Sequence, residues 1–184
     1  MSLYTPETVE CNGETFSIYL TKQELETRIA ELGNELSEKY EGKNPIFIGV
    51  LNGAYIFLSD LMRQVDISCE VDFLKLSSYG DEKVSSGQVT DLKDIDADIE
   101  DRHVVLVEDI VDTGLSMKYL MDKLQKKNPA SIASVTLLHK TEATHHDVQL
   151  DYVGFQIPTL FVLGYGLDYA QEGRNLAQIY ILDE

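Results

Sequence analysis

The sequence predicts an α/β fold in which a mostly parallel, twisted sheet is flanked by helices. Short apolar runs such as Ile46–Leu51 and Val104–Val107 are typical of strands that are buried on both faces. Segments with apolar residues at helical spacing separate these runs, and this alternation favours parallel strands joined by right-handed crossovers. The sequence has no internal repeat, low-complexity tract or linker, so residues 1–184 are expected to form a single domain.

Apolar and β-branched runs define the expected strands. In chain order they lie at Thr15–Leu20, Ile46–Leu51, Cys69–Ser78, Val104–Val107, Ile132–Leu138, Tyr152–Phe155 and Leu160–Leu163. The last two are expected to finish the sheet. Between the third and fourth strands, Asp91–Asp101 contains six acids and one lysine, and we expect it to be a solvated connection.

Capping and breaking residues define three helices. Thr21 and Glu24 have the spacing of a capping box, which predicts a helix that ends near Gly42. A second helix is expected over 54–64, after a turn at Gly53. A third helix follows the turn at 112–116 and ends before Pro129.

Charge and composition exclude several classes of protein. The formal net charge of −17 argues against a nucleic-acid partner and against binding to an anionic membrane. Cys11 and Cys69 are the only cysteines and form no CxxC motif, which argues against a disulfide framework or a structural zinc site. The first ten residues do not have the pattern of a signal peptide, and the uncharged runs are shorter than the about 20 residues that span a bilayer. We therefore expect a cytoplasmic protein.

The stretch Val104–Met117 carries the strongest functional signal. An apolar strand ends at Glu108 and Asp109, and the turn Asp112–Ser116 leads into a helix. At the carboxyl end of a parallel strand, small residues and a helix start can bind a phosphate group. The adjacent carboxylates would repel that phosphate, so ribose hydroxyls, Mg²⁺ or a proton are better partners for them. The alternative is structural: the acids end a strand and Asp112 caps a helix.

This stretch resembles the phosphoribosyl-pyrophosphate-binding motif of the type I phosphoribosyltransferases, and its wording VEDIVDTG is similar to that of the hypoxanthine–guanine branch. The similarity extends from Ile46 through Asp183. It includes, in the family's order, Leu51–Ala54, Ser78–Gly80, Ser86–Gly87, Leu137–Lys140 and Asp151–Tyr169.

The resemblance implies a type I phosphoribosyltransferase fold with a small hood, from about 1–20 and 150–184, over a core of about 21–149. It also implies a flexible loop that begins at Ser78 and Tyr79 and closes over the active site. The implied reaction transfers phosphoribose from phosphoribosyl pyrophosphate to hypoxanthine, and to guanine, with Mg²⁺ as cofactor. A homo-dimer or homo-tetramer is implied in the same way.

The resemblance also assigns roles to residues of the central motif. Glu108 and Asp109 would contact the ribose hydroxyls directly or through metal-bound water. Asp112 would be the general base that accepts a purine ring proton. The 5′-phosphate would be bound by the turn as a whole, which consists of Asp112, Thr113, Gly114, Leu115 and Ser116.

Residues outside this motif would bind the purine and the pyrophosphate. Lys140 would donate a hydrogen bond to the 6-oxo group, Phe161 would stack on the purine, and Val162 would offer backbone contacts. Asp168 would lie near the purine and bind Mg²⁺. The pyrophosphate would be bound by Leu51, Asn52, Gly53 and Arg174. Without the resemblance, Lys140 and Arg174 could be surface cations, Phe161 a core residue and Asp168 a loop acid.

Two departures from the family pattern lower the positive charge near the leaving group. Asn52 stands where the family commonly has lysine, and Thr141–Thr144 lacks an arginine that relatives often carry.

Two other functions fit the same motifs. One is a regulatory protein that senses phosphoribosyl pyrophosphate without turnover, and the other is an enzyme that prefers xanthine.

Overall fold

The computed structural model describes residues 6–78 and 89–183. Its strands are β1 (Thr8–Cys11), β2 (Glu14–Leu20), β3 (Ile46–Leu51), β4 (Glu70–Ser78), β5 (Val89–Lys93), β6 (His103–Val111), β7 (Ser131–Lys140), β8 (Tyr152–Ile157), β9 (Val162–Leu163) and β10 (Ile179–Leu182). Its helices are α1 (Lys22–Tyr40), α2 (Tyr55–Met62) and α3 (Leu115–Gln125).

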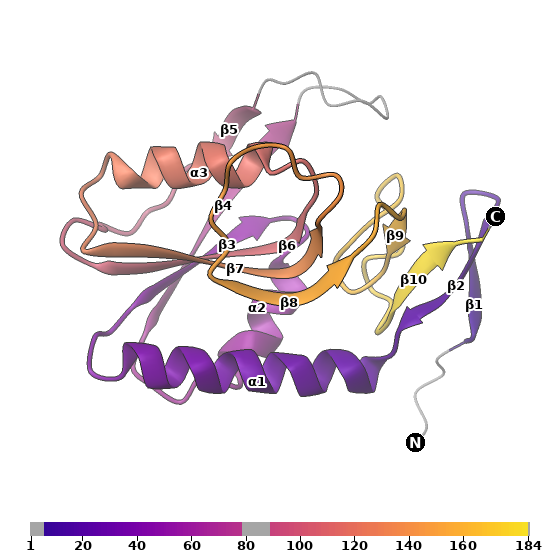
Figure 1. The fold of residues 1–184 in the computed structure, drawn as a ribbon, viewed down its shortest axis with the longest axis horizontal. Helices are drawn as coiled ribbons and strands as arrows, with labels where there is room; N and C mark the ends of the chain where they lie inside the picture. Colours follow the sequence, from indigo (N-terminus) through magenta and orange to yellow (C-terminus); the bar gives the residue numbers. More distant parts are fainter. Residues whose placement is uncertain (1–5, 79–88, 184) are drawn as a thin grey trace.

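These strands form two sheets of unequal size (Figure 1). The larger sheet has the order β5-β4-β3-β6-β7-β8, and all of its neighbouring strands are parallel except the β4–β5 pair. The smaller sheet, β1-β2-β10-β9, is antiparallel and lies beside one end of the larger one. The prediction of a mostly parallel sheet with a small second element is confirmed.

The centre of the larger sheet is buried on both faces because β3 and the first part of β6 are apolar at nearly every position. Phe47 and Val105 face α1 and α2, whereas their neighbours Ile46 and Val104 face α3. Figure 1 shows α1 and α3 on opposite sides of the sheet. Continuous apolar runs are the expected sequence of strands that are covered on both faces.

The first helix begins where the capping box predicts. The Thr21 hydroxyl accepts the Glu24 N–H at 3.3 Å, and the Glu24 carboxylate accepts the Thr21 N–H at 2.9 Å. The apolar residues that recur along α1, from Leu25 to Leu36, are buried against the sheet. No helix of the described ranges is both long and apolar enough to cross a bilayer.

The expectation of a solvated connection over Asp91–Asp101 holds only in part, because its acids at 94, 96, 98, 100 and 101 are exposed but the segment is anchored to the sheet. Its first residues belong to β5, and Ile95 and Ile99 are buried in the core on the α3 side. The carboxylate of Asp72 accepts the Asp96 and Ala97 N–H groups at 2.7 and 2.8 Å. Two buried isoleucines and one buried acceptor thus order a segment whose charge alone suggested exposure.

The last two predicted strands were expected to finish one sheet. In the structure they belong to different sheets. β8 pairs with β7 in the larger sheet, although the predicted hood range of about 150–184 includes it. β9 pairs with β10 in the smaller sheet, which also contains β1. β1 and β10 have four residues each and no long apolar run, so the sequence pattern did not reveal them.

Candidate functional site

Three parallel strands of the larger sheet end at one edge, and the loops that follow them meet there. In the sheet register Gly49 of β3 lies beside Val107 of β6, and Val111 of β6 lies beside His139 of β7. Three of the predicted motifs lie at the ends of β3 and β7 and in the turn after β6. The carboxyl edge of a parallel sheet is the usual place for a ligand in this architecture.

The turn after β6 has the form of an anion-binding helix start. Gly114 is the N-cap residue of α3 and has a φ of +86°, which glycine adopts without steric cost. A small cavity of about 80 Å³ is lined by Glu108 and by residues 110–117. The first N–H groups of a helix lack intrahelical acceptors and attract anions. Asp112 lies before this cap and makes no capping hydrogen bond, so its interpretation as the helix cap is wrong.

The prediction that the strand ends at Glu108 and Asp109 is wrong, because β6 continues through both acids to Val111. The pKa values of these two acids are strongly raised. Burial raises the pKa of Glu108 to about 8, and the neighbouring charge of Asp109 adds to the effect. Burial likewise raises the pKa of Asp109 to about 6; nearby Arg174 lowers it and Asp168 raises it. Both pKa values are raised because ionising a carboxyl group inside the protein is unfavourable. Neighbouring acids with raised pKa values are typical of functional sites. A cation at this position would relieve that cost.

The loop after β3 packs directly on one of these acids. A Cβ atom added to Gly53 would lie 1.8 Å from the Asp109 carboxylate, so only glycine fits there. The peptide bond between Leu51 and Asn52 is cis. On the other side of Gly53, a Cβ on Gly166 would lie 2.1 Å from the Gly53 carbonyl oxygen. The predicted pyrophosphate loop, Asp109 and the loop after β9 are therefore in contact.

The predicted general base and the predicted purine ligand form an ion pair. Lys140 Nζ lies 2.7 Å from Asp112 Oδ2. The Lys140 side chain is only 11% exposed, whereas the Asp112 side chain is 50% exposed. Lys140 therefore does not extend into solvent, and the alternative of a surface lysine is wrong.

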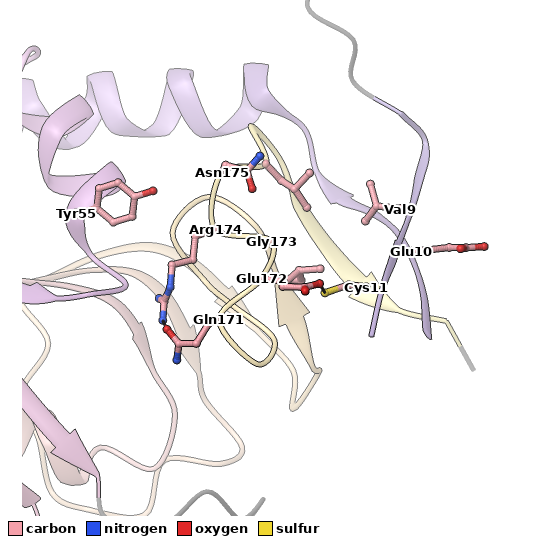
Figure 2. A pocket seen from close by; sticks show the side chains of 11 residues that line it. Val9, Glu10, Cys11, Tyr55, Gln171, Glu172, Gly173, Arg174 and Asn175 are labelled. Carbon is pink, nitrogen blue, oxygen red and sulfur yellow. Dashed lines mark hydrogen bonds between the residues drawn. The ribbon is translucent and has the colours of Figure 1, made fainter. Parts of the chain in front are cut away.

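Asp168 and Arg174 form a second ion pair, at 2.6 Å. The other Asp168 oxygen accepts the Gln171 N–H at 2.8 Å, and Arg174 also donates to the Gly166 carbonyl at 2.9 Å. Arg174 is only partly exposed, so it too differs from an ordinary surface cation. Behind it lies an open cavity of about 430 Å³, with Tyr55 of α2 on one wall and Cys11 of β1 on another (Figure 2).

The smaller sheet presents one aromatic ring to solvent. Phe161 is 44% exposed, although its ring centroid lies 5.1 Å from that of Tyr169 and 6.1 Å from that of Phe16. It is therefore a supported surface ring, and its interpretation as a core residue is wrong. The next residue, Val162, has a buried side chain and pairs with Ile181, so it can offer a ligand only its backbone.

Two further predictions concern the lid and a metal. Ser78 ends β4, and Tyr79 lies outside the described residues. Within residues 6–78 and 89–183, no three His, Cys, Asp or Glu side chains converge as a ready metal site. Mg²⁺ often binds through one or two carboxylates together with substrate phosphates, so the acids at Glu108, Asp109 and Asp168 fit such a cation without a preformed cage.

Sequence reasoning missed the residues that hold the site loops in place. Gly166 contacts Gly53, and the N–H groups of His145 and His146 lie 3.3 and 3.2 Å from the Thr113 carbonyl oxygen. Backbone N–H groups are common to nearly all residues, so nothing in the sequence marks these two.

Known proteins match this fold and this arrangement of motifs. The family model for the phosphoribosyl transferase domain matches residues 16–170. Hypoxanthine-guanine phosphoribosyltransferase of Bacillus subtilis is 42% identical over 90% of this chain and 92% of its own. A crystal structure of a hypoxanthine phosphoribosyltransferase from Staphylococcus aureus superposes with a TM-score of 0.86 at 38% identity, covering 91% of each chain.

One group of relatives is much longer. The bifunctional protein TilS/HprT of Listeria monocytogenes is 46% identical over 90% of this chain, which spans only 26% of that relative's length. The family model nevertheless covers most of the chain and includes the β6 turn, Lys140 and Phe161, and the Bacillus subtilis relative matches 90% of the chain. The chain therefore belongs to the phosphoribosyl transferase family, in its hypoxanthine–guanine branch.

Proposed function

We propose that this chain is a purine-salvage enzyme that transfers the 5-phosphoribosyl group from phosphoribosyl pyrophosphate to hypoxanthine, and to guanine. The products are IMP or GMP and pyrophosphate. The observation that carries this proposal is the pairing of Asp112 with Lys140 at 2.7 Å beside the helix start of α3. A proton acceptor and a hydrogen-bond donor for a 6-oxopurine thus lie next to a phosphate-binding turn.

In the proposed reaction a purine ring nitrogen attacks the anomeric carbon of the sugar while the bond from that carbon to pyrophosphate breaks. Lys140 donates a hydrogen bond to the purine 6-oxo group, and this favours 6-oxopurines over adenine, whose 6-amino group is itself a donor. Asp112 accepts the proton that the purine ring loses. The half-exposed Asp112 carboxylate is accessible to a bound base, as this role requires.

The phosphoribosyl group is bound at the edge of the larger sheet. The turn of residues 112–116 holds the 5′-phosphate through N–H groups and the hydroxyls of Thr113 and Ser116. Glu108 and Asp109 contact the ribose hydroxyls. Leu51, Asn52, Gly53 and Arg174 lie toward the pyrophosphate. The contact of Gly53 with Asp109 supports this arrangement because it brings the loop after β3 to the ribose acids.

The purine stacks on Phe161, and Val162 offers backbone groups to its edge. An exposed aromatic ring held by two other rings is a suitable platform for a base. Asp168, with Glu108 and Asp109, would hold Mg²⁺. When bound with pyrophosphate, Mg²⁺ supplies positive charge that stabilises the departing group. The raised pKa values of Glu108 and Asp109 support a cation at this place.

The remaining expectations follow from the family alone: a lid that includes Ser78 and Tyr79, a homo-dimer or homo-tetramer, and a cytoplasmic location. The two alternative functions make different predictions. A sensor of phosphoribosyl pyrophosphate would bind that ligand without turnover. A xanthine-preferring enzyme would release pyrophosphate fastest with xanthine.

The test is release of pyrophosphate from phosphoribosyl pyrophosphate and Mg²⁺, measured separately with hypoxanthine, guanine, xanthine and adenine. We expect turnover with hypoxanthine and guanine, loss of turnover in EDTA and restoration by added Mg²⁺. Binding of phosphoribosyl pyrophosphate without turnover of any base would contradict the proposal and support the sensor.

A further inference from the structure

The segment that follows Lys140 contacts the phosphate-binding turn from behind. We call residues 144–148 the support segment. The hydroxyl of Thr144 lies 2.6 Å from the Asp112 carbonyl oxygen and 3.0 Å from the Lys140 carbonyl oxygen. The Thr113 carbonyl accepts the N–H groups of His145 and His146. Two successive carbonyls of the turn are therefore bound to one segment.

This arrangement determines where the N–H groups of the turn point. In a trans peptide the C=O and the following N–H lie in one plane and point in opposite directions. The Asp112 and Thr113 carbonyls point toward the support segment, so the N–H groups of Thr113 and Gly114 point away from it. An anion in the turn needs N–H groups presented in this way.

Packing against Gly114 reinforces the same orientation. A Cβ atom added to Gly114 would lie 3.3 Å from a methyl carbon of Thr144 and 3.3 Å from one of Val148. The support segment thus closes one side of the turn. The Thr144 side chain contributes a methyl contact and a hydroxyl hydrogen bond to the same three-residue stretch.

Thr144 also connects the two residues proposed to handle the purine. Its hydroxyl has one proton, and the shorter distance is to the Asp112 carbonyl. The Lys140 carbonyl already accepts the N–H groups of Ala143 and Thr144, at 3.2 and 3.1 Å. Loss of the hydroxyl would therefore leave the Asp112 carbonyl without the bond that ties it to the end of β7.

We infer that Thr144 is a positioning residue for phosphoribosyl pyrophosphate: its hydroxyl holds the phosphate turn against the end of β7 and thereby orients the N–H groups that receive the 5′-phosphate. The inference rests on the proposed function of the turn. Thr144 itself makes no contact with substrate in this proposal. Loss of its hydroxyl is therefore expected to weaken the affinity for phosphoribosyl pyrophosphate rather than to slow proton transfer.

The test compares Thr144→Val, which keeps the shape but removes the hydroxyl, with Thr144→Ser, which keeps the hydroxyl. A matched control is Thr27→Val on α1, where the lost hydroxyl also donates to a backbone carbonyl, that of Gln23 at 2.8 Å. For each variant we would measure the KM of phosphoribosyl pyrophosphate, kcat, and the Kd of phosphoribosyl pyrophosphate with Mg²⁺ by calorimetry. Thermal unfolding would verify that each variant is folded.

We expect Thr144→Val to raise the KM and Kd of phosphoribosyl pyrophosphate ~5-fold or more, the size expected for one lost hydrogen bond, with a smaller change in kcat. Thr144→Ser should restore both, and Thr27→Val should match the wild type. If Thr144→Val does not fold, Thr144→Ala replaces it in the same comparison. Unchanged affinity for phosphoribosyl pyrophosphate, or a serine variant as weak as the valine variant, would overturn the inference. A wild type that binds this ligand without turnover would refute only the proposed function, because the calorimetric comparison still tests Thr144.

Discussion

The turn after β6 and the smaller sheet carry the two halves of the proposed site, and they are built differently. The turn uses consecutive residues, 108–116, at the end of one buried strand. The smaller sheet joins residues from both ends of the chain, because Phe16 of β2 packs against Phe161 and Tyr169. The residues proposed for phosphate binding and proton transfer are thus encoded locally, whereas the proposed purine platform forms only when the chain ends meet.

The two regions also differ in their electrostatics. The turn lies beside two acids whose pKa values are raised by burial. Phe161 and its neighbours form an aromatic group, with rings tilted or edge-on at centroid distances of 5.1 to 6.2 Å. Changes in the turn should therefore act on the affinity for phosphoribosyl pyrophosphate, on the chemical step and on its pH dependence. Changes in the smaller sheet should act on affinity for the base.

The largest effect should come from Asp112→Asn. General acid–base catalysis contributes about 10²- to 10⁴-fold, and we expect kcat to fall by that amount. Asparagine keeps a side-chain oxygen near Lys140, and the site is half exposed, so the unfolding midpoint should be almost unchanged. Asp122→Asn on the exposed side of α3, where Asp122 pairs with Lys118 at 3.4 Å, is the matched control. A kcat within a few-fold of wild type would remove Asp112 from the chemical step.

A smaller effect should follow from Phe161→Ala in the other region. Stacking of a base on an aromatic ring is worth about 1–3 kcal/mol, which corresponds to a rise of roughly 5- to 150-fold in the KM of the purine. The KM of phosphoribosyl pyrophosphate should change little, since the proposed site of its phosphoribosyl group is at the larger sheet. Val71→Ala removes a similarly exposed apolar side chain, 45% exposed, from β4 and should leave both KM values unchanged. Equal changes in both KM values would show that the two regions do not act separately.

The last prediction concerns how the free energy of unfolding depends on pH. Burial raises the folded-state pKa of Glu108 from 4.5 to about 8, so between these values the folded protein binds more protons than the unfolded chain. Stability without metal should therefore fall as the pH rises from about 5 to about 8. Glu108→Gln removes this ionisation and should stabilise the protein at pH 8.5 but have little effect at pH 5. Denaturant unfolding in EDTA at the two pH values measures the difference, and an equal effect at both would contradict the assigned cause.

The same difference between local and distant contacts determines which features could be predicted from the sequence. The capping box at Thr21 and Glu24 depends on neighbours in the chain and was predicted correctly. The strand that leads into Glu108 and Asp109 was also predicted, but its end was not, because β6 continues through both acids to Val111. The short strands β1 and β10 were not predicted, because each is stabilised by partners far away in the sequence. The burial of Ile99 within an acidic stretch was missed for the same reason.

The sequence by itself determined the alternation of strands and helices, the position of the phosphate turn and the residue types available for the chemistry. These features depend on local periodicity, on helix capping and on the permissive backbone of glycine, all of which a short stretch specifies. Only the tertiary structure decided which side chains meet: Asp112 with Lys140, Gly53 with Asp109, and the support segment with the turn. Such pairs form between loops distant in the chain because parallel strands bring their carboxyl ends to one edge of a sheet.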